Sequence, residues 1–161
     1  MWIWIVVVLA APLGVILAGV LFVLVSIRTG FAPGLTAVRR FNRRFTNRHN
    51  MKTAGQPGAT ASVIRHTGRS SGKSYETPIG ITEAGDRFVI LLPYGTNPDW
   101  LKNVLAAGTA EVVHEGVTYR ANEPEVVSTA SIAADLSRTD RLAKVFFGVD
   151  AALRLRPTVE A

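Results

Sequence analysis

The residues with the clearest chemical potential lie between positions 65 and 78, where cations, hydroxyls and glycines alternate. Arg65, Arg69 and Lys73 supply positive charge, and serines at 70, 71 and 74 supply hydroxyl donors. Gly68 and Gly72 permit backbone conformations that turn successive N–H groups into one concavity. Such a set of donors suits phosphate or carboxylate oxygens. The stretch therefore predicts an anion-binding loop.

Two simpler interpretations of this loop have to be weighed. A nucleotide-binding P-loop needs four residues between its glycines and runs directly into a helix. Here only three residues separate Gly68 from Gly72, and Pro78 and β-branched residues follow, which favours a strand. An ordinary polar hairpin loop remains open on these residues alone.

Composition and charge exclude several other function classes. The chain has no cysteine, so it has no disulfide, thiolate metal site or cysteine nucleophile, and redox chemistry would need an organic cofactor. The three histidines are too scattered for a zinc motif, and no metal is expected. Seven positive charges precede residue 53, whereas the remainder carries eleven Lys or Arg against twelve Asp or Glu. This local basicity does not indicate a nucleic-acid-binding domain.

Residues 1–28 are expected to form a transmembrane anchor. Positions 2–27 carry no charged side chain, a length sufficient to span a bilayer, with Trp2 and Trp4 at one end and Arg28 at the other. The run is longer than the apolar region of a signal peptide and lacks its basic start. Because the cations follow the span, we expect a single-pass protein of the cell membrane whose domain faces the cytoplasm.

Residues 29–60 are expected to form a basic amphipathic juxtamembrane segment and linker. Between residues 35 and 48, Leu35, Val38, Phe41 and Phe45 recur at helical spacing with arginines between them. This helix could lie on an anionic membrane surface or pack against the domain, and the sequence does not choose between them. Glycines and a proline between Asn50 and Thr60 indicate a linker.

Residues 61–161 are expected to form one domain rich in β-strands. Strands are predicted at 61–67, 75–82, 87–93, 111–114, 117–121 and 125–127, with a hairpin turn at Glu115-Gly116. Asn97 and Pro98 are predicted to cap a short helix from Asp99 to about Ala107, and a second helix is predicted over 128–147. No regular βαβ alternation appears. The pattern predicts an α+β fold, a small antiparallel barrel with flanking helices.

The run from Ser62 to about Val127 resembles the deazaflavin (F420)-dependent nitroreductase family of split β-barrel oxidoreductases. The resemblance lies in the order and spacing of four short motifs: Thr67-Gly68-Arg69-Ser70-Ser71-Gly72-Lys73, Glu76-Thr77-Pro78-Ile79, Gly85-Asp86-Arg87-Phe88-Val89 and Gly95-Thr96-Asn97-Pro98-Asp99-Trp100-Leu101-Lys102-Asn103-Val104. It implies a split β-barrel that binds coenzyme F420, a deazaflavin with a phosphate and a polyglutamate tail.

The resemblance also implies which residues bind the cofactor. It assigns the phosphate and tail to Gly68, Arg69, Ser70, Ser71, Gly72 and Lys73, and the ring system to Thr77, Pro78, Tyr94, Gly95 and Asn97. Trp100 and Asn103 are expected to be structural, the latter tying its helix to the loop. The family implies hydride transfer with no catalytic triad, and a pairing of Asp99 with His114 has no support in the sequence.

Some positions depart from the family pattern. Ser70 and Tyr75 stand where basic residues are frequent, and the C-terminal stretch 143–148 lacks the tyrosines of members that reduce nitro compounds. Phe146 and Phe147 either line an apolar substrate pocket or belong to the core, and we expect core residues. The sequence thus favours a membrane-anchored oxidoreductase that transfers hydride between F420 and a lipophilic small-molecule acceptor, a quinone or a nitro compound. The alternatives are a barrel that binds FMN or haem, or a non-enzymatic module that binds a coenzyme or membrane lipid. A homodimer is a further expectation.

Overall fold

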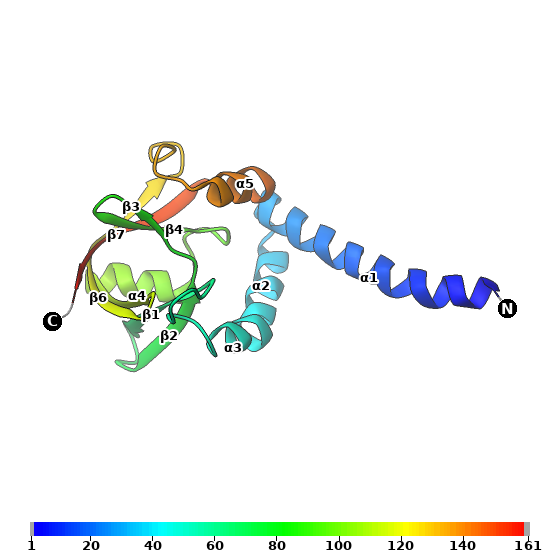
Figure 1. Ribbon diagram of the computed structural model, residues 1–161, viewed down its shortest axis with the longest axis horizontal. Helices are drawn as coiled ribbons and strands as arrows, with labels where there is room; N and C mark the ends of the chain where they lie inside the picture. Colours follow the sequence, from blue (N-terminus) through cyan, green and yellow to red (C-terminus); the bar gives the residue numbers. More distant parts are fainter. Residues whose placement is uncertain (1, 160–161) are drawn as a thin grey trace.

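One antiparallel sheet of seven strands organises the computed structural model, which describes residues 2–159 and the side chains of residues 11–159. The strands are β1 (Ser62–Thr67), β2 (Ser74–Ile79), β3 (Thr82–Ala84), β4 (Arg87–Leu91), β5 (Thr109–His114), β6 (Val117–Ser128) and β7 (Ala151–Val159). Their order in the sheet is β2-β1-β5-β6-β7-β4-β3. Figure 1 shows this sheet curled into a half-barrel. The expected α+β class and antiparallel pairing are confirmed.

The predicted hairpin at Glu115-Gly116 joins β5 to β6, and both of its turn residues have positive φ angles, 49° and 78°. The strand predicted at Glu125–Val127 is the second half of β6. Between Asn122 and Glu125 the register of β6 against β7 shifts, and Glu123 has a φ of 54°. This irregularity bends β6, as bulges do, and helps the sheet to curl.

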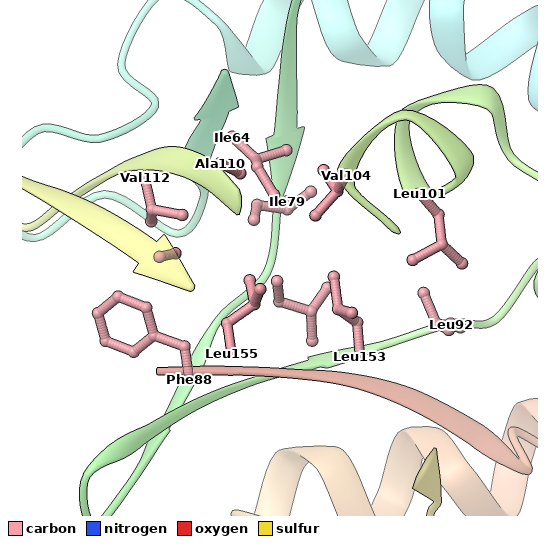
Figure 2. Close-up of a cluster of buried hydrophobic side chains, with 12 residues drawn as sticks. Ile64, Ile79, Phe88, Leu92, Leu101, Val104, Ala110, Val112, Leu153 and Leu155 are labelled. Carbon is pink, nitrogen blue, oxygen red and sulfur yellow. The ribbon is translucent and has the colours of Figure 1, made fainter. Parts of the chain in front are cut away.

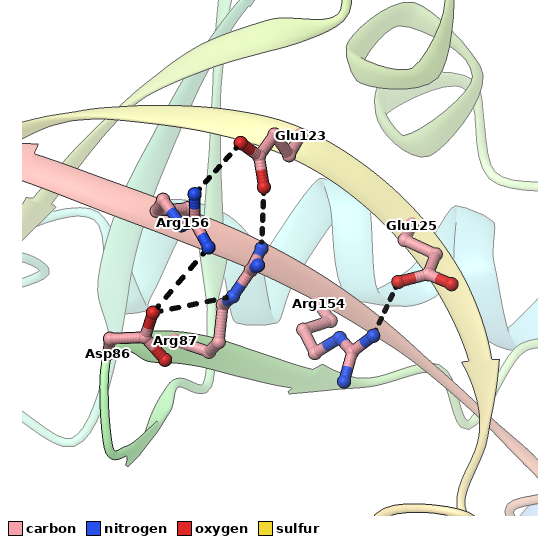
Figure 3. A network of polar contacts seen from close by, with 6 residues as sticks. All are labelled: Asp86, Arg87, Glu123, Glu125, Arg154 and Arg156. Atoms are coloured by element: carbon pink, nitrogen blue, oxygen red, sulfur yellow. Dashed lines mark hydrogen bonds and ion pairs between the residues drawn. The ribbon is translucent and has the colours of Figure 1, made fainter.

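A set of ion pairs surrounds this bulge, as Figure 3 shows. Glu123 accepts hydrogen bonds from Arg87 at 3.0 Å and from Arg156 at 3.1 Å, so one carboxylate links β4, β6 and β7. Arg154 donates to Glu125 at 2.6 Å. Such exposed pairs stabilise little individually, but together they favour a single register at the bulge.

The structure corrects the C-terminal part of the sequence prediction in two places. The helix predicted over 128–147 begins only at Arg138, where Ser137 and Asp140 form a capping box, and α5 runs Arg138–Phe147. Residues 129–135 are turns whose Ile132 packs with Val89 and Ala152. Strand β7 was not predicted at all, although it occupies the sheet between β6 and β4.

The main core lies between the sheet and α4 (Asp99–Ala107). Figure 2 shows Leu101 and Val104 of α4 turned toward Leu153 and Leu155 of β7, and all four side chains are fully buried. The predicted extent of α4 is confirmed. Its N-cap, however, is Pro98 instead of Asn97, and no side chain caps the helix.

The N-terminal third of the chain is mostly helical. Helix α1 (Trp2–Thr29) projects away from the domain in Figure 1, and its part from Ala11 to Thr29 is long and apolar enough to cross a membrane by length and composition. The side chains of Trp2 and Trp4 lie outside the described residues. Arg28 donates to the backbone oxygen of Val145 at 3.0 Å, which attaches the end of α1 to the C-terminal turn of α5.

A tight elbow joins α1 to α2 (Ala32–Phe41). Gly30 has a φ of +66°, the Phe31 N–H donates to the Ser26 carbonyl at 3.1 Å, and Ser26 is 1% exposed. A Cβ on Gly34 would lie 2.2 Å from the Ser26 hydroxyl oxygen, so only glycine fits there. The elbow is therefore closely packed.

After α2 the helix continues through a π-helical turn, η1 (Asn42–Thr46), and α3 (Asn47–Asn50). The segment from Asn50 to Thr60, which the sequence indicates as a linker, is a series of turns. Its Gly55 donates to the carbonyl of Ala61 at 2.8 Å and accepts from the N–H of Gly116 at 2.7 Å. These bonds hold the segment against the β5–β6 hairpin.

Candidate active site

A cavity of about 700 Å³ lies between the N-terminal helices and the domain. One wall is α2, η1 and α3, and the others are the loop after β1, strand β2 and residues 94–103. Its lining comprises Thr36, Arg39, Arg40, Asn42, Arg43, Asn47, His66, Gly68, Arg69, Ser70, Ser71, Tyr75, Glu76, Thr77, Tyr94, Asn97, Pro98, Asp99, Trp100 and Asn103. Cations, amides, hydroxyls and aromatic rings thus share one space.

The cavity brings together seven of the eleven residues that the sequence assigns to the cofactor. They are Gly68, Arg69, Ser70, Ser71, Thr77, Tyr94 and Asn97. The other four, Gly72, Lys73, Pro78 and Gly95, adjoin these residues in the chain but are not part of the lining. The two motifs on the loop and on β2 therefore reach the same space as the turn before α4.

The backbone of the 68–73 loop differs from the expected cradle of free N–H groups. Gly68 donates to the Lys73 carbonyl and Gly72 to the Gly68 carbonyl, each at 2.8 Å, and Lys73 donates to the Ser71 hydroxyl at 3.3 Å. Gly72 has a φ of +64°, whereas a Cβ on Gly68 would lie 2.4 Å from the hydroxyl of Ser71. These N–H groups stabilise the loop itself, so its side chains provide most of its capacity for anions.

Asn103 connects the loop to α4, as the sequence predicts. Its buried side-chain oxygen accepts from the Arg69 backbone N–H at 3.2 Å and from the Arg69 guanidinium at 2.8 Å. Its amide nitrogen lies 3.1 Å from Nδ1 of His66. Burial lowers the pKa of His66 below its usual value, which favours a neutral ring. Arg69 is therefore held in place, with Asp99 at 3.1 Å as its ion-pair partner.

Tyr94 links the domain to the helical segment that follows α1. The Asn42 amide donates to the Tyr94 hydroxyl oxygen at 2.5 Å, and Asn42 is the first residue of the π-helical turn. Burial raises the pKa of Tyr94, although the bond from Asn42 acts in the opposite direction. The phenol is therefore neutral at physiological pH, and its oxygen already accepts a bond, so its proton is free to be donated into the cavity.

The sequence prediction did not include the residues of the helical wall. Thr36, Arg39, Arg40, Arg43 and Asn47 recur at steps of three and four residues, which puts them on one side of the helix. Of the two open interpretations of this segment, the structure supports packing against the domain. Its Phe41 and Phe45 remain exposed and lie 5.0 Å apart between ring centroids. The spacing of the polar residues in the sequence was the signal that could have indicated this wall of the cavity.

Other candidate residues lie elsewhere. Arg65 pairs with Glu111 and with Glu76, and these hydrogen bonds, the one to Glu111 first, raise its pKa. His114 contacts Ser62 and Glu83, so it forms no pair with Asp99.

The aromatic residues of α5 also lie away from the site. The expectation that Phe146 is a core residue is wrong, because its side chain is 62% exposed at the end of α5, and Phe147 is half-buried. Neither residue lines the cavity.

The chemistry of the cavity fits a ligand that combines anionic groups with a planar ring. Arg69 and the helix arginines offer charge to phosphate or carboxylate oxygens, and the serine hydroxyls add donors. Trp100, Tyr75 and Tyr94 offer aromatic surface and hydroxyl groups beside them. In residues 11–159 no cluster of histidine and acidic side chains could hold a metal ion. A coenzyme such as F420 has both parts that this lining suits.

One comparison with known proteins, the match to a family, agrees with this fit. The F420H(2)-dependent quinone reductase family matches residues 37–142. No curated protein matches the sequence. Similar solved structures include a protein called F420 Reductase (14% identity, covering 66% of this chain and 91% of that one, TM-score 0.45). A second is an F420-H2 Dependent Reductase, FDR-A (15% identity, covering 60% of this chain and 94% of that one, TM-score 0.38). A third is a domain-swapped dimer (14% identity, covering 75% of this chain and 98% of that one, TM-score 0.47). The match over residues 37–142 shows that the chain belongs to the F420H(2)-dependent quinone reductase family, and it is an F420-dependent oxidoreductase.

Proposed function

We propose that this protein is a membrane-anchored, cytoplasm-facing reductase that transfers hydride from reduced F420 to a lipophilic acceptor, with a quinone as the first candidate. The observation that carries the proposal is the continuity of α1 with the wall of the cavity. The helical segment that follows the apolar α1 contributes Thr36, Arg39, Arg40, Asn42, Arg43 and Asn47 to the lining.

This continuity favours an acceptor that is dissolved in the membrane. The elbow between α1 and α2 is closely packed, and Arg28 attaches the end of α1 to α5. If α1 spans the bilayer, the cavity stays within a short distance of the headgroups. Tethering of this kind raises the effective concentration of the site toward molecules in the same membrane.

The residues of the lining have distinct parts in the proposed reaction. Reduced F420, when bound, supplies the hydride, and the protein supplies orientation and electrostatics. Arg69, Ser70 and Ser71 are proposed to bind anionic oxygens of the cofactor, with Gly68 allowing the close turn of the loop. Thr77 and Asn97 are proposed to contact its ring system. Gly72, Lys73, Pro78 and Gly95 flank these residues and stay predictions.

Tyr94 is proposed to donate a hydrogen bond to the acceptor. A quinone oxygen gains negative charge as hydride arrives and needs a proton, and a neutral phenol that is already oriented by Asn42 is suited to donate toward it. The C-terminal tyrosines of nitro-reducing family members have no counterpart in α5, and Phe146 is exposed and does not line the cavity. We therefore propose quinones ahead of nitro compounds.

The test uses the full chain in lipid nanodiscs, because the N-terminal helices form part of the cavity. Oxidised and reduced F420 are titrated by fluorescence, and turnover of a menaquinone analogue is then followed by the absorbance of F420. Binding at micromolar concentration with turnover is expected. If F420 binds but neither quinones nor nitro compounds are reduced, the protein is a coenzyme-binding module. If the purified protein is yellow or red and does not bind F420, its cofactor is FMN or haem.

Tyr94→Phe is the matched variant for the proton-donating part. It should keep F420 affinity within about threefold and reduce the turnover number about 10²-fold or more, the usual contribution of general acid catalysis. Equal turnover by both proteins would contradict the role of the hydroxyl.

The orientation is tested separately with Ala130→Cys, since the natural chain has no cysteine. A membrane-impermeant maleimide should label this exposed position only after the cells are lysed. Labelling of intact spheroplasts would contradict the cytoplasmic orientation.

A further inference from the structure

We propose that Arg39, Arg40 and Arg43 of the juxtamembrane helix bind the phosphate and the carboxylates of the cofactor tail. The inference rests on the binding of F420 and extends the site of its anionic part from the 68–73 loop to a second segment. The three arginines line the cavity together with Arg69, so the helical wall supplies three of its four arginines.

The positions of these arginines form one face of the helix. Arg39 and Arg43 are four residues apart and Arg40 and Arg43 three apart, which brings like charges close together on the helix surface. Such neighbours repel one another and destabilise a helix slightly. An anion bound between them reverses the sign of this interaction, so the cluster favours a ligand with several negative charges.

No acidic side chain compensates the cluster within residues 11–159. The two acidic residues of the lining are Glu76, which pairs with Arg65, and Asp99, which pairs with Arg69. The three helix arginines form no ion pair in the described part of the chain, and no acidic residue precedes Glu76 in the sequence. Their charge is therefore available to a ligand.

The loop after β1 has less capacity for anions than its sequence suggests. Its N–H groups at Gly68, Gly72 and Lys73 already donate within the loop. Lys73 lies outside the lining, and Arg65 is engaged by two glutamates. The cationic surface of the cavity thus continues from Arg69 onto the helix, and this is the path that the geometry assigns to the tail.

Arginine suits the proposed ligand chemically. The planar guanidinium can donate two parallel hydrogen bonds to a phosphate or to a glutamate carboxylate. A phosphodiester followed by successive carboxylates offers several such acceptors in a row. An array of arginines at successive helical positions can therefore bind several of these groups at once.

The experiment compares ligands that differ only in the anionic part. Full-length protein in nanodiscs of neutral lipid is titrated with F420 carrying short or long tails, and with the deazaflavin ring compound that lacks phosphate and tail. The variant Arg39→Gln/Arg40→Gln/Arg43→Gln is compared with Arg44→Gln/Arg48→Gln, which removes charge from the same segment outside the cavity. We expect the first variant to lose at least tenfold in F420 affinity and most of the dependence on tail length, while the ring compound binds both variants equally.

Each other outcome overturns the inference in a recognisable way. Retained tail dependence in the triple variant, or an equal loss in the Arg44 and Arg48 control, would exclude a specific role for the three residues. A variant that keeps F420 affinity but loses binding to anionic vesicles would identify a lipid phosphate as the ligand instead. If wild-type protein binds the ring compound without any gain from the tail, this inference fails while the reductase function stands. If it binds neither compound, the reductase function fails as well.

A single replacement guards against misfolding of the triple variant. If the triple variant loses affinity for the ring compound, the single variant Arg43→Gln is compared with Arg44→Gln as its control. Tail dependence unchanged in Arg43→Gln would then overturn the inference, and a loss confined to it would support it.

Discussion

Asn103→Ala is the substitution that most directly tests how the loop is held on α4. The Asn103 side chain is 5% exposed and makes three polar contacts, two with Arg69 at 3.2 and 2.8 Å and one with Nδ1 of His66 at 3.1 Å. Alanine leaves the part-buried N–H of Arg69 and the buried His66 ring without these partners.

The expected loss follows from these contacts. A buried polar group that loses its partner costs about 1–3 kcal/mol, which applies in full to the His66 nitrogen and at the lower end to the part-buried Arg69 N–H. The Arg69 guanidinium is partly exposed, so water replaces that bond at little cost. We therefore expect the free energy of unfolding to fall by about 2–4 kcal/mol. For a domain of this size the melting temperature should fall by roughly 10–25 °C.

Thermal unfolding of the full chain in detergent, followed by tryptophan fluorescence, measures this change. Leu105→Ala is the matched control, because Leu105 lies on the outer face of the same helix and is 39% exposed. It should lower the melting temperature by only a few degrees. If Asn103→Ala and wild type have the same melting temperature, or if Leu105→Ala lowers it as much as Asn103→Ala does, the loop is held by other contacts.

Three further predictions concern the protonation of His66, the elbow and the core. Because burial lowers the pKa of His66 in the folded state, the unfolded chain takes up a proton first as the pH falls below 6.5. The melting temperature should therefore decrease with falling pH in this range, and it should decrease less steeply in His66→Gln. Gly34→Ala should cost about 1–3 kcal/mol and increase proteolysis at the elbow, since its Cβ would meet Ser26 at 2.2 Å, whereas Gly19→Ala, with open space around it, should not. Leu153→Ala should lower the free energy of unfolding by about 2–5 kcal/mol in denaturant titrations, and a loss under 1 kcal/mol would contradict the central position of β7.

Local patterns in the sequence were sufficient for most of the elements. Runs of β-forming residues between turn signals indicated five of the strands, and α4 was predicted with its observed bounds. The apolar spacing of Ile132 and Leu136 imitated a helix, but these residues are buried by turns that pack on the sheet. The alternation of Leu153 and Leu155 with Arg154 and Arg156 was present in the sequence without being interpreted as a strand. Which strands β7 pairs with depends on contacts far apart in the chain.

In the candidate site too, local residue patterns could be interpreted from the sequence, whereas contacts between distant segments could not. The residue types of the 68–73 loop indicated an anion site, and the motifs around Thr77 and Asn97 indicated which segments reach it. Sequence could not reveal that Arg65 is neutralised by Glu111 from a distant strand. Nor could it reveal that Asn42 bonds to Tyr94, 52 positions away. Pairing of charges is a property of the folded chain, so the unpaired arginines became recognisable only in the structure.

The position of β7 has a consequence for how the domain reaches its native state. Without this strand the sheet separates into β2-β1-β5-β6 and β4-β3, and β6 and β4 become additional open edges. Because β7 follows all other strands in the sequence, both edges stay unpaired during synthesis until Ala151–Val159 has been made. Contacts of such long sequence separation form slowly, and open edges invite pairing with other chains. We therefore expect the insertion of β7 to be the step at which productive folding competes with strand exchange between neighbouring molecules.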